Sequence, residues 1–202
     1  MPPNGPLDPE RARLRAALLE LTAEHGYDSL SLGQLLRRAG LSPAAFERHF
    51  ASLEDCFAAV WGEVDAELSE AIASAYRGPG QWRERLRRAF LAGLRYLAAD
   101  PARARLYITE AYQLNQEFRL RQYDSVARLG LIIDRGRQEE PGVERLPPEI
   151  AEVISGAIWC RVVDLVRAGH SAQLPEQLHE LMYLAVLPYL GVEAAEAELR
   201  PA

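Results

Sequence analysis

The chain has 202 residues, 49% of them hydrophobic and 26% charged, with a formal net charge of −6. This length fits one globular unit, or a small head on a larger body, and no apolar run approaches the roughly 20 residues that a membrane-spanning helix needs. The negative charge argues against a general nucleic-acid binder, because such proteins carry a broad basic surface.

The first predicted helix opens at Asp8-Pro9-Glu10. The seven residues before it lack the basic and apolar regions of a signal peptide. Apolar residues then recur at steps of three and four, which places them on one helix face: Leu14, Ala17, Leu18 and Leu21. Gly26 ends the helix, and Tyr27 packs beneath it.

Ser31 begins a second predicted helix, and Gln34 stands three residues later, the spacing of a capping box. One buried stripe is formed by Leu32, Leu35, Leu36 and Ala39. Gly40 follows, and glycine readily takes the left-handed conformation that ends a helix. The pattern therefore predicts a short helix between Ser31 and Gly40.

A third short helix follows after a three-residue turn, with Ser42 as its N-cap and Pro43 at the first helical position. Phe46 and Phe50 are four residues apart and face inward. The side chains that then face outward are those of Pro43, Ala44, Glu47 and Arg48. A short helix held clear of a compact three-helix head has the shape of an element that enters the DNA major groove.

The stretch from Arg11 to Val60 resembles the TetR family of bacterial regulators. The resemblance lies in the apolar first helix and in the motifs Gly26-Tyr27, Ser31, Ala39-Gly40-Leu41-Ser42, Phe46, His49-Phe50-Ala51-Ser52 and Glu54. It implies an all-α fold, in which an N-terminal helix-turn-helix head (residues 9–52) joins a helical ligand-binding and dimerisation bundle (residues 53–191). It also implies a sequence-specific DNA-binding transcriptional regulator. The residues that we predict at the DNA are Ser31, Gln34, Ser42, Pro43, Ala44, Arg48 and His49, with Arg48 the strongest candidate.

Two residues depart from the family pattern, which often has Tyr where Glu47 stands and Lys where Leu53 stands. Both family residues usually touch DNA phosphates, whereas a carboxylate is repelled by them. Residues 10–52 carry six Arg and five acidic residues, a net charge of +1. We expect compensating contacts from Arg11, Arg13, Arg15, Arg37, Arg38, Arg48 or His49. Glu47 either pairs with a neighbouring Arg or accepts a hydrogen bond from a cytosine amino group.

Helices are predicted for the rest of the chain, over residues 53–76, 81–99, 101–138 (with or without a kink), 148–168 and 175–190, with an acidic, proline-rich loop at 139–148. The last two helices are apolar over more than one stripe, so they need burial on two sides. In the TetR family the equivalent pair forms a four-helix bundle with its two-fold mate. The resemblance therefore implies a homodimer through helices 148–168 and 175–190; the centre of a monomeric bundle is the alternative.

The resemblance also implies a small-molecule effector pocket between residues 81 and 165. Our candidates for its lining are the aromatic residues Trp82, Phe90, Tyr107, Tyr112, Phe118 and Trp159. Pockets are commonly apolar with a few polar anchors. Aromatic residues at helical spacing also serve as plain core packing, which is the alternative for each of them.

A catalytic role has little support in the sequence. A di-iron site in a helical bundle needs Glu-x-x-His from two helices, and this chain has the motif once, at Glu176–His179. Cys56 and Cys160 lie far apart in apolar helical patterns, which predicts two reduced, buried thiols in a cytoplasmic protein. A redox-sensing thiol is the alternative.

The sequence therefore predicts a non-enzymatic, cytoplasmic transcriptional regulator that needs no cofactor or metal. We expect a repressor that a small apolar or amphipathic ligand releases, although the sequence does not separate a repressor from an activator. The alternative is a dimeric ligand-sensing protein whose head no longer binds DNA specifically, because of Glu47 and Leu53.

Overall fold

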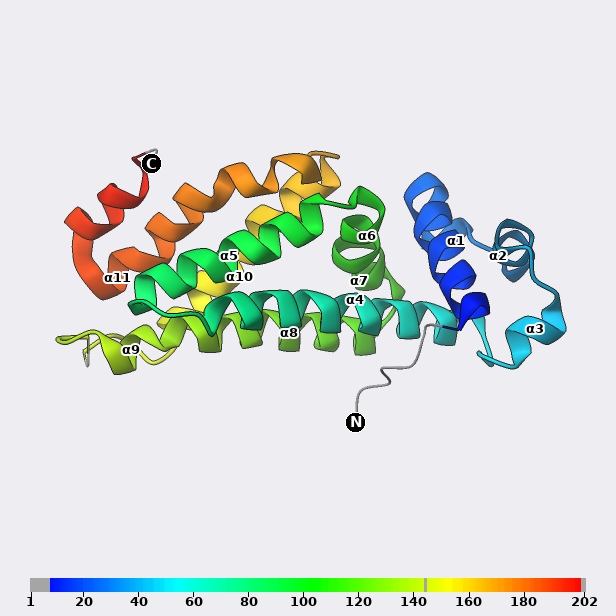
Figure 1. Ribbon diagram of the computed structural model, residues 1–202, viewed down its shortest axis with the longest axis horizontal. Helices are drawn as coiled ribbons and strands as arrows, with labels where there is room; N and C mark the ends of the chain where they lie inside the picture. Colours follow the sequence, from blue (N-terminus) through cyan, green and yellow to red (C-terminus); the bar gives the residue numbers. More distant parts are fainter. Residues whose placement is uncertain (1–7, 144, 201–202) are drawn as a thin grey trace.

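The computed structural model describes residues 8–143 and 145–200, except for the side chains of Tyr112 and Gln113. Over these residues the fold is all-α, as predicted (Figure 1). The α-helices are α1 (Pro9–His25), α2 (Leu32–Ala39), α3 (Pro43–Glu47), α4 (Leu53–Tyr76), α5 (Trp82–Ala98), α6 (Pro101–Arg105), α7 (Ala111–Leu114), α8 (Gln116–Asp134), α9 (Gly136–Glu139), α10 (Ile150–Arg167) and α11 (Leu178–Glu198). Shorter elements are the 3₁₀ turns η1 (Tyr27–Ser29) and η3 (Ser171–Gln177) and the π-helix η2 (Leu106–Glu110).

Helices α1, α2 and α3 form a head at one end of the long axis (Figure 1). The predicted caps are present: Ser31 and Gln34 form a capping box, and the Ser42 hydroxyl accepts a hydrogen bond from the Ala45 backbone N–H at 3.2 Å. Gly40 has φ of 64°, the left-handed conformation that a side chain would strain. Each helix of the head is therefore delimited by local chemistry that the sequence already contains.

Helix α4 belongs to the packing of both head and body, because it runs from the head along the length of the body (Figure 1). Near its start, Phe57 packs edge-on against Tyr27, with ring centroids 4.7 Å apart. Further along, Glu67 pairs with Arg15 of α1, with Nη1 and Oε1 2.6 Å apart. The predicted boundary between head and body, at residues 52 and 53, thus falls between α3 and α4, and the hydrophobic core continues across it.

The Arg15–Glu67 pair gives a pH-dependent stability that can be measured. The Arg15 hydrogen bond, followed by one from the Tyr96 hydroxyl, lowers the pKa of Glu67 below its ordinary value of 4.5. A carboxyl group with a lowered pKa in the folded state stabilises that state at higher pH, and loses this effect as the pH falls through the lowered pKa.

We therefore expect the variant Glu67→Gln to melt at a lower temperature than wild type at neutral pH. The difference should shrink as the pH is lowered below 4.5, because the wild-type carboxylate then becomes protonated. Thermal unfolding of both proteins by circular dichroism across this range is the test. A difference that stays constant at every pH would contradict this role of Glu67.

The prediction of one helix over residues 101–138, with or without a kink, is wrong, because this segment is divided into several elements. After α6 the backbone widens into the π-helix η2, and α7 ends at Leu114. Asn115 has an extended backbone (φ −159°, ψ −179°), and its side-chain Oδ1 accepts a hydrogen bond from the Phe118 N–H at 3.1 Å. This residue is the N-cap of α8, so a new helix starts where the prediction continued the old one.

The C-terminal helix α11 starts at Leu178, later than the predicted residue 175, because residues 171–177 form the 3₁₀ turn η3. It continues past the predicted end at residue 190, with a kink at Gly191, where φ is 80°. Beyond the kink the Glu198 side chain is fully buried and pairs with Arg83 and Arg87 of α5. None of the described helices is both long and apolar enough to cross a membrane.

The two cysteines have different environments, so the prediction that both are buried is wrong for one of them. Cys56 is fully buried, and this burial raises the pKa of its thiol to about 12. Cys160 is exposed, because it lies on the outer side of α10. We expect the Cys56 thiol to stay unmodified by iodoacetamide in the native protein and to react after denaturation, measured by the mass of its tryptic peptide. Rapid labelling of Cys56 in the native protein would contradict this expectation.

Candidate functional site

The outer surface of the head contains most of the residues that we predicted at the DNA. Ser31, Ser42, Pro43, Ala44 and Arg48 are exposed, while Gln34 and His49 are half-buried. The serine hydroxyls and the Gln34 side chain take part in the helix caps. Ser31 and Gln34 lie at the beginning of α2, Ser42, Pro43 and Ala44 lie at the beginning of α3, and Arg48 and His49 follow the end of α3. Their contact with DNA stays a prediction.

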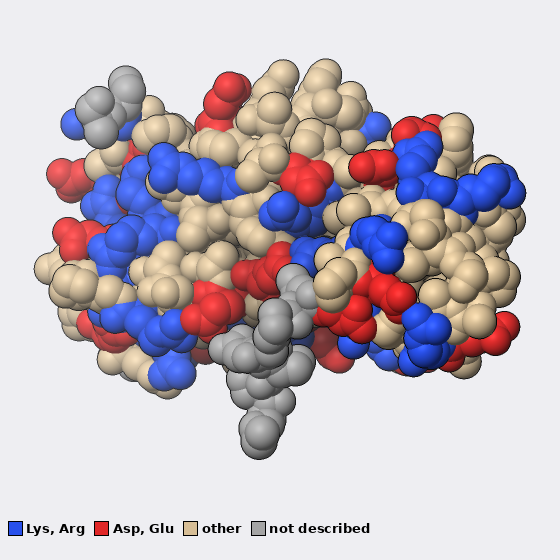
Figure 2. Space-filling model, turned by 45° about the vertical axis from the view of Figure 1, so that its right-hand side comes forward, with Lys and Arg blue, Asp and Glu red and all other residues tan. Residues whose placement is uncertain are grey.

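Most arginines of the head are already paired with acidic side chains. Arg11 contacts Glu63, Arg15 contacts Glu67, Arg38 contacts Glu20 and Glu24, and Arg48 contacts Glu10. Basic and acidic side chains are accordingly interspersed over the visible surface in Figure 2. The head thus has no broad basic face in this view, and any binding of phosphates depends on a small number of free cations.

Arg13 and Arg37 are the two arginines of residues 10–52 for which the described part of the chain offers no ion pair. Both are exposed. A Cβ atom added at Gly40, in the turn between α2 and α3, would lie 4.0 Å from Arg13 Nη1, and one added at Gly33 in α2 would lie 3.4 Å from Arg37 Nη1. These two guanidinium groups therefore lie beside the helix-turn-helix elements with their charge available.

The two residues that depart from the family pattern have different environments. Glu47 is exposed at the end of α3 and makes no ion pair with any described residue, so the expected pairing with a neighbouring Arg is absent from this structure. Leu53 is half-buried and packs against the hydrophobic core. Glu47 thus contributes an uncompensated negative charge to the outer surface, whereas Leu53 contributes packing.

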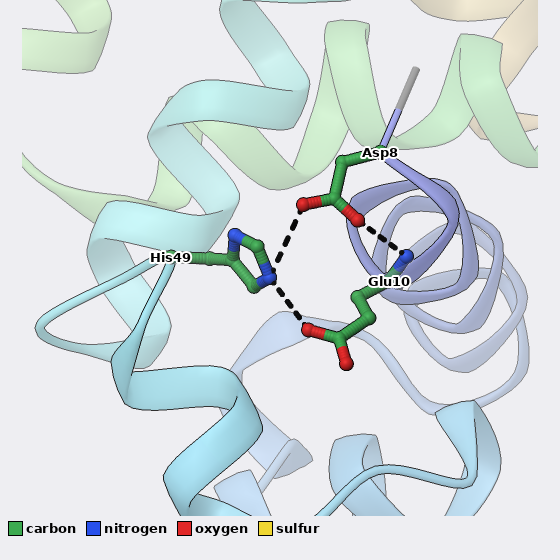
Figure 3. Close-up of side chains that lie close together, drawn as sticks. All are labelled: Asp8, Glu10 and His49. Atoms are coloured by element: carbon green, nitrogen blue, oxygen red, sulfur yellow. Dashed lines mark hydrogen bonds and ion pairs between the residues drawn. The ribbon is translucent and has the colours of Figure 1, made fainter. Parts of the chain in front are cut away.

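Glu10 joins the start of α1 to the end of α3 (Figure 3). Its Oε2 lies 2.8 Å from Arg48 Nη2 and 2.8 Å from His49 Nε2. The hydrogen bond from His49, followed by the one from Arg48, lowers the pKa of Glu10 from its ordinary value. The same His49 nitrogen lies 3.5 Å from Asp8 Oδ2. The strongest predicted DNA contact, Arg48, therefore has an acidic partner within the protein.

Asp8, Glu10 and His49 also place three potential metal-ligand atoms within 4.8 Å of one another. The surroundings do not suit a cation. The Glu10 carboxylate already forms an ion pair with Arg48. The Asp8 carboxylate accepts a hydrogen bond from the Glu10 backbone N–H at 3.0 Å, as the N-cap of α1. The N-terminus of a helix carries partial positive charge, which favours anions. The group is better described as an ion-pair cluster that connects α1 to α3.

A cavity of about 90 Å³ lies inside the body. Its lining comes from α4, α5, η2, α8, α10 and α11 and is mostly apolar, with the hydroxyl groups of Ser125 and Ser155 among its few polar groups. Three of the predicted aromatic residues line it, namely Phe90, Tyr107 and Trp159. A concave, mostly apolar space with a few polar groups is the usual form of a small-molecule site.

The other predicted aromatic residues lie elsewhere or outside the described side chains. Trp82, the first residue of α5, is fully buried and packs against Tyr189 of α11, with ring centroids 4.9 Å apart. Phe118 packs edge-on against Phe57 and Trp61 beneath the head. Both are core residues in this structure and not part of the cavity wall. Tyr112 is outside the described side chains.

Tyr107 connects the cavity to a polar cluster at its side. Its hydroxyl donates to Asp65 Oδ1 at 2.7 Å, and Asp65 also accepts hydrogen bonds from Ser125 and Arg128. An adjoining cleft of about 190 Å³ is lined by these four residues together with apolar side chains. Burial and the Asp65 carboxylate raise the pKa of Tyr107 above its ordinary value. Sequence reasoning missed Asp65, Ser125 and Arg128, which come from helices distant in the chain.

The π-helix η2 carries both the cavity wall and a contact with the head. The Tyr107 carbonyl accepts hydrogen bonds from the side chains of Trp61 and Gln122, at 3.2 and 2.7 Å. At the end of the same element the buried Glu110 accepts the Tyr27 backbone N–H at 2.8 Å. Such π-helical turns are rare and are often found at functional sites. This one physically connects the cavity to the end of α1.

Apolar side chains remain exposed on the two helices that we predicted at a dimer interface. Val153 of α10 is 65% exposed, and Leu184 and Val192 of α11 are 43% and 58% exposed. The small residues Ala157 and Cys160 are exposed on α10 as well. Most other apolar residues of these helices are buried in the protomer itself.

Comparison with known proteins agrees with this architecture. Residues 14–60 match the family model described as bacterial regulatory proteins of the tetR family. The chain is similar to the fatty acid degradation regulator FadR from Bacillus halodurans, with a TM-score of 0.79 and 20% identity over 90% of this chain and 97% of that one. It is also similar to FadR from Bacillus subtilis in complex with stearoyl-CoA, with a TM-score of 0.75 and 19% identity over 90% of this chain and 98% of that one. A tetR-family regulator from Rhodococcus RHA1 has a TM-score of 0.72 and 22% identity over 91% of this chain and 98% of that one.

Proposed function

We propose that the chain is a repressor of the TetR family, whose family model residues 14–60 match, and that it leaves its operator DNA when a small apolar or amphipathic ligand binds. The observation that supports this most is the pairing of a helix-turn-helix head with an apolar cavity in the body of the same chain. A regulator of this kind binds DNA and a ligand without catalysing a reaction. It would act in the cytoplasm, where the DNA is.

Within this proposal, the head contacts DNA through the starts of α2 and α3. Ser31, Gln34, Ser42, Pro43 and Ala44 lie at those starts. Arg48 lies at the end of α3 and is 59% exposed, whereas His49 is turned toward α1 and serves to position its neighbours. Arg13 and Arg37 add phosphate contacts. A few placed arginines suit an acidic protein, because each phosphate contact releases counterions from DNA.

The ligand that we propose has an acyl or similarly apolar chain. The cavity lining is apolar, and one protein of the same fold, FadR from Bacillus subtilis, was solved with stearoyl-CoA. The present volume of about 90 Å³ is well below the roughly 300–1,000 Å³ of typical ligand pockets. A long chain therefore requires the helices around the cavity to separate, so the ligand favours a different conformation of the body.

The π-helix η2 offers a path for this change to reach the DNA. A ligand that displaces Tyr107 moves the same short element that holds Tyr27 through Glu110. The head would then change its orientation on the body. In a homodimer through α10 and α11, the spacing of the two heads would depart from the ~34–36 Å that separates successive major grooves. The exposed apolar residues Val153 and Leu184 support this choice of interface.

A second function keeps specific support from the head itself. Glu47 is an exposed, unpaired carboxylate among the described residues at the end of α3, and no Lys stands at Leu53. A dimeric ligand sensor without specific DNA binding would have such a surface. The two functions differ in their prediction for DNA: only the repressor discriminates between sequences.

The experiment is affinity selection of sheared genomic DNA from the source organism by the purified full-length protein, with excess random duplex as competitor. We expect one or a few segments to be enriched, and stearoyl-CoA or lauric acid to release them. Enriched segments that neither compound releases would support DNA binding and contradict the proposed acyl-chain ligand. Recovery of genomic DNA without any enriched segment would favour the sensor.

A further inference from the structure

The Glu10 carboxylate is bound to the guanidinium group of Arg48, the residue that we predict most strongly at the DNA. We propose that Glu10 acts as an intramolecular competitor for DNA: it neutralises Arg48 in the free protein and thereby limits binding to DNA of arbitrary sequence. This inference rests on the proposed DNA-binding function and adds a residue that determines its specificity. Besides the unpaired Glu47, the head thus contains a second carboxylate near the end of α3, Glu10, which is paired with Arg48.

The geometry allows Arg48 to exchange partners without refolding. Both Glu10 oxygens contact the same nitrogen, Arg48 Nη2, at 2.9 and 2.8 Å. The other guanidinium nitrogens have no carboxylate partner among the described residues; Nη1 makes only a 3.5 Å contact with the Ala44 carbonyl. Since Arg48 is 59% exposed, rotation of its side chain is enough to exchange Glu10 for an external anion.

His49 keeps Glu10 in place whichever partner Arg48 has. Its Nε2 contacts Glu10 Oε2 at 2.8 Å, and the imidazole side chain is only 14% exposed (Figure 3). Asp8 lies on the other side of the same nitrogen at 3.5 Å. The Glu10 carboxylate is therefore fixed beside the end of α3. When Arg48 turns to DNA, this fixed negative charge stays close to the phosphates and opposes weak, sequence-independent complexes.

The competition has a measurable consequence for random DNA. The variant Glu10→Gln keeps the size of the side chain and removes its charge, so Arg48 becomes available as one more phosphate contact. Each such contact steepens the dependence of log affinity on log salt by about 0.9, which corresponds to roughly eightfold tighter binding at about 0.1 M salt. We expect this gain to disappear when Arg48 is also replaced.

The test is fluorescence anisotropy of full-length protein with a random-sequence duplex at several salt concentrations. The variants are wild type, Glu10→Gln, Arg48→Ala and the double variant, and Glu24→Gln is the matched control. Glu24 lies on the same helix, and its partner Arg38 keeps its second contact with Glu20 at 2.9 Å. The control thus changes the net charge of the head equally without freeing Arg48. Circular dichroism shows whether each variant is folded, and Glu10→Ala is a second variant that lacks the carboxylate.

The proposal expects Glu10→Gln to bind random DNA roughly eightfold more tightly and with a steeper salt dependence. The control should change much less, and the double variant should bind like Arg48→Ala. Equal behaviour of Glu10→Gln and Glu24→Gln, or weaker binding by Glu10→Gln, would overturn the competitor role while leaving DNA binding intact. Absence of binding by every variant at low salt would overturn both this role and the proposed function.

Discussion

The double replacement Arg13→Ala and Arg37→Ala should weaken binding to the operator by roughly 60-fold at about 0.1 M salt, because each lost phosphate contact accounts for about eightfold. These are the arginines of the head without an ion pair among the described residues, so their charge is available to DNA. The slope of log affinity against log salt should fall by about two units in magnitude. Anisotropy titrations of a selected operator at several salt concentrations measure both quantities.

The matched control for this prediction removes two exposed arginines of the body, Arg95 and Arg167, for which the described residues also provide no ion pair. Its net charge equals that of the head variant. An equal loss of affinity in both double variants would mean that overall charge, and not placed contacts, governs binding. The assignment of Arg13 and Arg37 to the DNA surface would then be wrong.

Replacing Trp82 by alanine should lower the free energy of unfolding by about 3 kcal/mol. Truncation of a buried aromatic side chain usually costs about 3–5 kcal/mol, because a cavity remains, and Trp82 is fully buried. A partial offset of about 1–2 kcal/mol is expected, since the Trp82 Nε1 has no hydrogen-bond partner in the described part of the chain and its removal relieves a buried unpaired donor.

Urea unfolding followed by circular dichroism measures this change, and Trp159→Ala is the control. Trp159 is only half-buried and lines the existing cavity, so its loss should be smaller. A change of less than about 1 kcal/mol for Trp82→Ala would contradict the assignment of Trp82 to the core. It would reopen the earlier interpretation of Trp82 as part of the ligand site.

The head could be predicted closely because its signals are local. The Ser31–Gln34 capping box and the left-handed Gly40 each depend on residues within one or two helical turns, and both are present in the structure. The Asn115 cap was missed, although it is equally local, because the apolar pattern continues on both sides of it. The π-helix η2 had no such signal, since the side chains of Trp61 and Gln122 that bond its carbonyl oxygen come from other helices.

The candidate site was only partly predictable for the same physical reason. Which residues face outward on α3 follows from helical spacing, and the structure bears this out for Arg48. Its pairing with Glu10 joins residues far apart in the chain, and no sequence pattern indicates it. Likewise, Phe90 and Trp82 both lie on α5, and only the packing of other helices places one at the cavity and the other in the core.

Footprinting on a selected genomic segment tests whether the head of this chain recognises a specific DNA sequence. We expect protection of two related half-sites whose centres lie about one helical turn apart, ~34–36 Å, as a two-fold dimer requires. Excess random duplex should leave this protection in place. Protection that random duplex removes at equal concentration, or that covers the segment without half-sites, would mean that the head does not recognise a specific sequence.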